Sequence, residues 1–151
     1  MPFPNPKNPA NQNGRYLEHP DGSFVQDEIE YTLLVTALAA GASAPASAQI
    51  NSDSDFFAQK RMFWADVAGT PTAQPLINLQ VVDAASGKQL FSAPTPLYMV
   101  AGTGQLPFIL PMVRRWDANS QIQGTFTNFS SATTYANVYL TFAGVRRYLA
   151  S

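Results

Sequence analysis

Apolar and polar residues alternate most clearly in the last third of the chain, in the segments 121–129 and 135–148. A period of two is typical of a strand with one buried face, because successive side chains point to opposite sides of a sheet. The residues predicted to face the interior are Ile122, Gly124, Phe126, Val138, Leu140 and Phe142. Together with the apolar segment 107–116, these segments predict three strands in an antiparallel meander, whose apolar side must pack on a second sheet.

Turn-forming residues separate earlier apolar segments that also predict strands. These segments are 28–38, a short one at 48–51, 56–67, 76–82, 89–92 and 97–101. A helix is the alternative for 28–38, because alanine is frequent directly after it. Residues 41–47 are small and predict a flexible connection. Residues 83–88 predict a hairpin turn in which Gly87 adopts a positive φ.

The number and spacing of these elements indicate the fold class. Seven or eight short strands with proline at their ends, and no sustained helical periodicity, predict an all-β antiparallel sandwich or jelly roll. At 151 residues and 46% hydrophobic content, the chain is long enough for one domain with a sizeable core. We therefore expect a β-sandwich domain over residues 27–151, preceded by an extended arm over residues 1–26.

The expected arm is rich in proline, asparagine and glycine, which prevents a regular helix or a central strand. Such a segment buries too little apolar surface to order by itself. It nevertheless carries four apolar residues that we expect to anchor it on a neighbouring subunit or a larger partner: Phe3, Tyr16, Leu17 and Phe24. A terminus without fixed contacts is the alternative.

The net charge is −1 and only 13% of residues are charged, so the chain has no basic field to bind nucleic acid. A polar but neutral surface protects poorly against self-association, which favours an oligomer. The absence of cysteine excludes disulfides and thiolate metal sites.

Residues 32–48 imitate a secretory signal, with an apolar run followed by an Ala-x-Ala sequence. However, acidic rather than basic residues precede the run, which is also too short to span a bilayer. We therefore expect no signal and no membrane anchor in this segment.

Candidate catalytic and metal-binding residues are few. His19 is the single histidine, and one imidazole without cysteine does not build a typical zinc site. The segment 51–55 resembles a calcium loop only superficially, because it lacks the central glycine and the bidentate glutamate. We expect no catalytic residue, no metal and no cofactor.

Three basic pairs follow or lie within apolar strands, at 60–61, 114–115 and 146–147. Adjacent strand residues point to opposite faces, so one member of each pair is expected to point towards the core or a rim. The pairs indicate either protection of sheet edges or ion pairs with a partner subunit. The candidate interface residues are Arg114, Arg115, Trp116, Arg146, Arg147 and Tyr148.

The closing strand carries a more specific pattern, Leu140-Thr-Phe-Ala-Gly-Val-Arg146, after the segments Pro-Met-Val-Arg-Arg-Trp116 and Gly-Thr-Phe-Thr-Asn-Phe-Ser130. This pattern resembles the C-terminal half of small virion proteins of tailed bacteriophages, whose sandwich ends on a Leu-x-Phe-x-Gly-x-Arg-like strand. The resemblance covers about the last third of the chain.

The resemblance implies a capsid decoration, or cement, protein: a noncatalytic jelly-roll subunit on the outer surface of the virion head that bridges neighbouring major capsid proteins. It also implies a homo-oligomer, which we expect to be a trimer or a dimer. One alternative is a tail, baseplate or head-fibre protein that binds glycans of the host surface. Another is a small carbohydrate-active or ligand-binding jelly roll, which requires a concave pocket with converging carboxylates.

Overall fold

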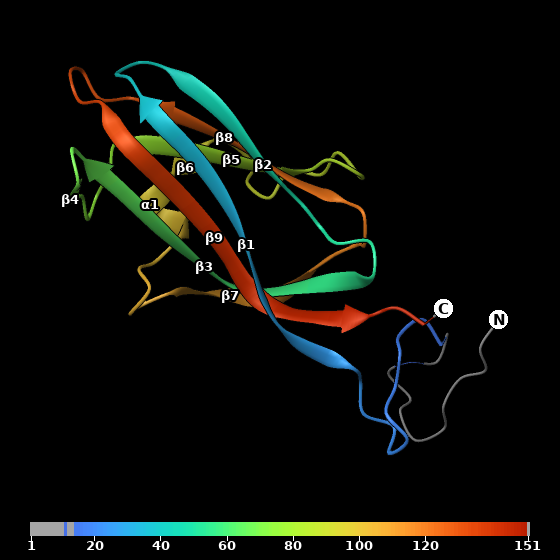
Figure 1. Ribbon diagram of the computed structural model, residues 1–151. Coiled ribbons are helices and arrows are strands. Elements are labelled where there is room, and N and C mark those ends of the chain that lie inside the picture. Colours follow the sequence, from blue (N-terminus) through green and yellow to red (C-terminus); the bar gives the residue numbers. More distant parts are fainter. Residues whose placement is uncertain (1–10, 12–13, 151) are drawn as a thin grey trace.

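The computed structural model describes Asn11 and residues 14–150, which form two antiparallel sheets packed face to face (Figure 1). These residues are nearly all β structure. The strands are β1 (Gln26–Leu38), β2 (Ser43–Gln49), β3 (Ser54–Val67), β4 (Thr70–Pro71), β5 (Ile77–Asp83), β6 (Thr95–Pro96), β7 (Phe108–Trp116), β8 (Gln121–Asn128) and β9 (Tyr135–Tyr148). A single helical turn, α1 (Leu97–Val100), lies between β6 and β7. No helix in this part of the chain is long and apolar enough to cross a membrane.

The strand order defines a jelly roll. One sheet has the order β1-β9-β3, with β7 and β4 both pairing along the far edge of β3, and the other has the order β2-β8-β5-β6. The antiparallel pairs β1–β9, β2–β8, β3–β7 and β5–β6 alternate between the two sheets. A chain that wraps as four such pairs is a double-sheet jelly roll. The predicted all-β sandwich is therefore confirmed, with nine strands in the described residues if the short β4 is counted.

The core lies between the sheets and is made by the residues whose alternation predicted it. Val138, Leu140 and Phe142 of β9 are fully buried, as are Ile122 and Phe126 of β8. Trp116 at the end of β7 packs its ring edge against Phe142, with ring centroids 6.2 Å apart. The prediction that β8 and β9 each have one buried face is confirmed.

The predicted meander of the last third is wrong. β8 lies in the sheet opposite β7 and β9, and it pairs with β2 and β5. The short polar connections at 117–120 and 129–134 therefore carry the chain from one sheet to the other. Alternation indicates that a strand has a buried face, but both sheets offer such a face, so the pattern does not select the partner strand.

Residues 43–49 form β2 rather than the predicted connection, and the strand predicted at 48–51 is only its end. Ala44, Ala46 and Ala48 are half-buried and alternate with exposed residues. The small side chains give little strand propensity, but pairing with β8 fixes the segment. β2 is an edge strand, which explains why it accommodates Pro45.

The predictions for 89–92 and 97–101 are also wrong. Residues 97–100 form the helical turn α1, closed by a hydrogen bond from the Ala101 amide to the Leu97 carbonyl. The return after the hairpin is reduced to one bridge between Val82 and Gln89. Pro94 and Pro96 lack amide donors, so this segment cannot form a continuous ladder. The hairpin turn itself is confirmed, with Gly87 at φ +70°.

Candidate functional site

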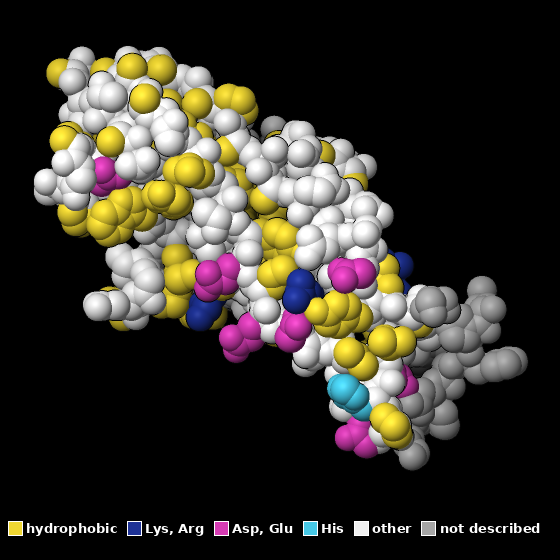
Figure 2. All heavy atoms as spheres, in the orientation of Figure 1, with side chains coloured by type: hydrophobic (Ala, Val, Ile, Leu, Met, Phe, Trp, Pro, Cys, Tyr) yellow, Lys and Arg dark blue, Asp and Glu magenta, His cyan; other side chains and the backbone are white. Residues whose placement is uncertain are grey.

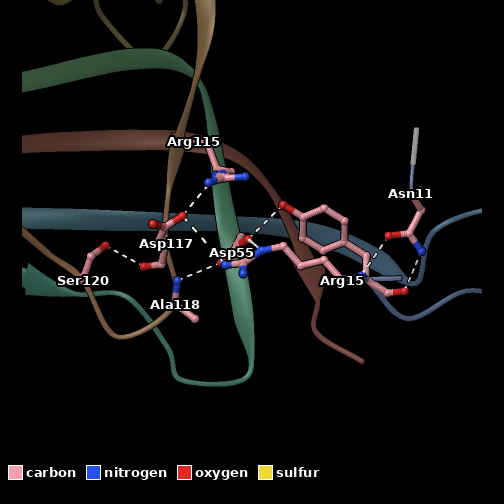
Figure 3. Close-up of polar contacts among 8 residues, drawn as sticks. Asn11, Arg15, Asp55, Arg115, Asp117, Ala118 and Ser120 are labelled. Atoms are coloured by element: carbon pink, nitrogen blue, oxygen red, sulfur yellow. Dashed lines mark hydrogen bonds and ion pairs between the residues drawn. The ribbon is translucent and has the colours of Figure 1, made fainter. Parts of the chain in front are cut away.

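The clearest polar cluster among the described residues joins Arg15 and Tyr16 to the sandwich at Asp55, a fully buried residue of β3 (Figure 3). Arg15 donates to both carboxylate oxygens of Asp55, from Nε at 2.8 Å and from Nη2 at 3.0 Å. The Tyr16 hydroxyl and the Ala118 amide donate to the same carboxylate, each at 2.8 Å. Four donors from three residues therefore satisfy one buried carboxylate.

The protonation of Asp55 follows from these contacts. Burial alone raises the pKa of its carboxyl, but the hydrogen bonds from Arg15, Ala118 and Tyr16 outweigh burial and hold the pKa below its ordinary value of 3.8. The same carboxylate raises the pKa of Arg15. The group is thus a permanent ion pair at neutral pH that fixes the arm.

An aromatic cluster holds the arm at a second point. The Arg147 guanidinium lies 4.2 Å from the ring centroid of Phe24 and 4.4 Å from that of Phe57. Tyr16 packs edge-on against both Phe24 and Phe57. Register and alternation place Phe57 and Arg147 on the face of their sheet that is turned away from β8. The arm therefore covers one end of that outer face.

Main-chain bonds continue the pairing beyond the end of β9. The Leu17 amide donates to the Tyr148 carbonyl at 2.8 Å, and the Ala150 amide donates to the Arg15 carbonyl at 2.9 Å. The predicted arm is thus attached to its own sandwich over residues 14–26, and β1 begins at Gln26.

The four predicted arm anchors have different surroundings. Tyr16 is 8% exposed and Phe24 is partly buried, and both contact the chain's own sandwich. Leu17 is 43% exposed and presents its side chain to the surface. Phe3 lies outside the described residues. The role of these residues in binding a partner stays a prediction. Among the three that the structure describes, Leu17 is the one whose side chain is exposed enough to contact a partner.

The candidate interface residues of β7 separate by face. Trp116 is fully buried in the core. The Arg114 guanidinium lies 4.9 Å from the Trp116 ring centroid, and Nη2 lies 4.0 Å from Asp83. Arg115 is exposed and forms an ion pair with Asp117 at 3.0 Å. Of the three, Arg115 is the one whose side chain is about half exposed to solvent and can contact a partner.

The candidate interface residues of β9 contact β1 and the arm. Arg146 forms an ion pair with Asp27, and the Tyr148 hydroxyl donates to the same carboxylate at 3.0 Å. Arg147 also donates to the Gln26 side chain at 3.0 Å. In the single subunit these residues hold neighbouring elements together.

A row of exposed apolar side chains, missed in the sequence, crosses the outer face of the β1-β9-β3 sheet. Leu34 lies opposite Tyr139, which in turn lies opposite Trp64. Their exposed fractions are 45%, 37% and 44%. Figure 2 shows hydrophobic side chains gathered over this part of the sheet. We call these three residues the outer row.

The outer row was not predicted because the segment 56–67 has no clean alternation. The reason is a β-bulge in β3 between Ala58 and Lys60. The extra residue reverses the facing of every later position in the strand, which leaves Trp64 outside and Ala65 inside.

The edge strand β7 carries a second exposed apolar group. Residues 110–113 of β7 lie opposite Gln59 alone, so this part of the strand arches away from its partner. The exposed fractions of Met112 and Val113 are 82% and 54%. Ile109 and Leu106 beside the arch are 66% and 81% exposed. The arch interrupts the free edge and presents apolar side chains instead of a continuous backbone ladder.

The residues considered for metal chemistry are placed in structural roles. Asp55, in the segment 51–55 that resembles a calcium loop, accepts hydrogen bonds from the arm, and Asp53 accepts one from Ser54. His19 is exposed. Within residues 11 and 14–150, no group of three or more His, Cys, Asp or Glu side chains could hold a metal ion.

The fold and these surfaces define the class: an all-β jelly-roll domain with an attached N-terminal segment and two exposed apolar groups. No protein-family model matches the chain, and no curated protein matches it either.

Proposed function

We propose that this chain is a noncatalytic virion structural protein of the capsid decoration, or cement, type, which binds the outside of the shell formed by the major capsid protein. The observation that carries the proposal is the outer row, Leu34, Tyr139 and Trp64, which exposes large apolar side chains in register on the outer face of the sheet. A contiguous exposed apolar patch on a soluble domain is typical of a protein-binding surface.

Two further features support this role. A jelly roll is one of the architectures of virion subunits, although the fold alone does not determine function. The low charge of the chain favours close contact with copies of itself and with a shell. In the proposal the sandwich assembles as a trimer or dimer and bridges neighbouring capsid subunits, so that their separation must also break the added interfaces.

The structure refines the part assigned to the arm. Tyr16 and Phe24 hold the arm on its own sandwich, so Leu17 and Phe3 are the anchors proposed to contact a partner. Deleting residues 2–10 tests Phe3 and keeps Arg15 and Tyr16, which donate to the Asp55 carboxylate. A longer deletion through residue 26 would unpair Asp55 and confuse a binding defect with a folding defect.

The decisive experiment adds the purified chain to virion heads that lack it and measures bound copies per head by gel densitometry and electron microscopy. The double variant Trp64→Ser/Tyr139→Ser is expected to lose occupancy. The control variant Gln123→Ala/Thr125→Ala changes two exposed positions on β8, in the other sheet, and is expected to bind like the unaltered chain. If the unaltered chain does not bind heads, or if the outer-row variant binds equally, the proposal is wrong.

A second candidate function is glycan binding by a tail, baseplate or head-fibre protein. It is favoured by the pocket of about 430 Å³ beside Trp64, which also includes the uncharged polar residues Thr72, Thr103 and Gln105. An exposed indole beside neutral hydrogen-bonding groups suits the face of a sugar ring. Binding on a glycan array that Trp64→Ser abolishes, together with labelling of tails rather than heads, would support this candidate.

A further inference from the structure

The two sheets are open at the edge formed by β7 and the hairpin that follows β5. β7 pairs only with β3, and the opposing sheet ends there in the two-residue strand β6 and the bridge at Gln89. A groove of about 820 Å³ lies between these edges. Leu90, Phe91, Phe108 and Leu110 contribute apolar side chains to its lining.

Arg61 lies in this groove and is the most unusual residue of the interior. Although its side chain is charged, Arg61 is only 7% exposed. It belongs to β3, which lies between β9 and β7 in its sheet. The bulge after Ala58 turns Arg61 inwards, while its neighbour Lys60 takes the outer face. The sequence predicted that one member of this basic pair points inwards, and the bulge determines which one.

The contacts of Arg61 leave its charge without a counter-charge. Nε donates to the Val100 carbonyl at 2.7 Å, and the guanidinium lies 5.3 Å and 5.1 Å from the ring centroids of Phe91 and Phe108. Among the described residues, no carboxylate lies within ion-pair distance of Arg61. Burial lowers the pKa of Arg61 to about 10, so the side chain is still charged at neutral pH. A buried charge without a partner is unfavourable for folding.

The other charged groups around the groove do not relieve this imbalance. Asp83 faces Arg114, and Asp117 pairs with Arg115. Lys88 also lines the groove and forms no ion pair within the described part of the chain. The site therefore offers two unmatched cations against an apolar wall, with both carboxylates already engaged.

We propose that this groove binds an extended segment of a partner protein in which an acidic side chain between apolar neighbours pairs with Arg61. Apolar residues of the segment fill the space beside Phe91, Phe108 and Leu110, and its carboxylate replaces the water that otherwise solvates the guanidinium. A polyanion without apolar groups fits less well, because it would leave the side chains of Phe91, Phe108 and Leu110 uncovered. The inference goes beyond the proposed function, because it holds for any protein partner.

The test uses the full chain labelled with ¹⁵N and two short peptides, acetyl-Gly-Leu-Glu-Leu-Gly-amide and the same peptide with Gln in place of Glu. The Glu peptide is expected to shift the amide signals of residues 89–91 and 108–110, and the Gln peptide to bind about tenfold more weakly, as expected for loss of a charge-assisted bond. Equal affinity for the two peptides, or shifts elsewhere on the molecule, would overturn the proposal.

Variants separate binding from a structural role. Arg61→Met keeps a similar volume without the charge, so it should weaken the Glu peptide about tenfold and leave the melting temperature of the free chain equal or higher. Lys60→Met removes the neighbouring cation on the opposite face and should bind like the unaltered chain. Arg61→Lys keeps a charge and should retain part of the binding, which also serves if Arg61→Met folds poorly.

Two outcomes would contradict the inference directly. A lower melting temperature for Arg61→Met with unchanged peptide affinity would make Arg61 a structural residue. Displacement of the Glu peptide by an equal concentration of inorganic phosphate would make the groove a general anion site instead of a site for a protein segment.

Discussion

Arg15 and Asp55, forty positions apart in the chain, form a bidentate ion pair with Nε–Oδ2 and Nη2–Oδ1 distances of 2.8 Å and 3.0 Å. The carboxylate is fully buried, whereas the Arg15 side chain is 43% exposed. The asymmetry shows which residue matters more for stability. Removing the arginine lets solvent approach the pair, but removing the carboxylate leaves several donors without an acceptor.

Replacing Asp55 with alanine should therefore lower the free energy of unfolding by about 3 kcal/mol, because Arg15, Tyr16 and Ala118 all lose their acceptor. Urea unfolding followed by tryptophan fluorescence measures this change. The control is Arg115→Met, which breaks the exposed pair with Asp117 and should cost less than about 0.5 kcal/mol. Equal costs for the two variants would show that the buried cluster has no special role.

The same carboxylate predicts a pH dependence. Its folded-state pKa lies below the ordinary value of 3.8, so the folded state binds the proton less readily than the unfolded chain. The stabilisation is fully present above that value and is lost as the pH falls through the folded-state pKa. The stability difference between the unaltered chain and Asp55→Asn should be constant near neutral pH and shrink below about pH 4. A difference that grows on acidification would contradict this assignment.

The comparison of sequence and structure shows what a hydrophobic pattern contains. The range and buried face of β9 follow from alternation alone, because the inward residues at its centre, Val138, Leu140 and Phe142, are large and apolar. β2 gives no such signal, since its half-buried residues are alanines and its partner β8 lies far along the chain. The inward direction of Arg61 depends on the bulge at Gln59. A bulge is a feature of strand pairing, so the residue types alone do not predict it.

The orientation of β1 predicts a large loss of stability on substitution of one leucine and a small loss on substitution of the next. Leu33 is fully buried between the sheets, and Leu34 is 45% exposed in the outer row. Leu33→Ala should lower the free energy of unfolding by about 3 kcal/mol, because it leaves a cavity in the core. Leu34→Ala should change it by less than about 0.5 kcal/mol. Thermal or urea unfolding of both variants checks the register of β1, and a one-residue slip would reverse the two results.

Close packing explains why position 144, in the closing strand, is a glycine. Gly87, which has open space around it, provides the comparison that tests this explanation. A Cβ at Gly144 would collide with the carbonyl oxygen of Phe57, because β9 approaches β3 closely beside the bulge. Gly144→Ala should therefore lower the free energy of unfolding by about 3 kcal/mol, since the central strand must shift. Gly87 has φ +70° but no atom within 4 Å of a built Cβ, so Gly87→Ala carries only the backbone cost of about 1 kcal/mol. Urea unfolding of the two variants distinguishes collision from backbone strain, and equal losses would show that the close approach of β9 to β3 does not determine the glycine.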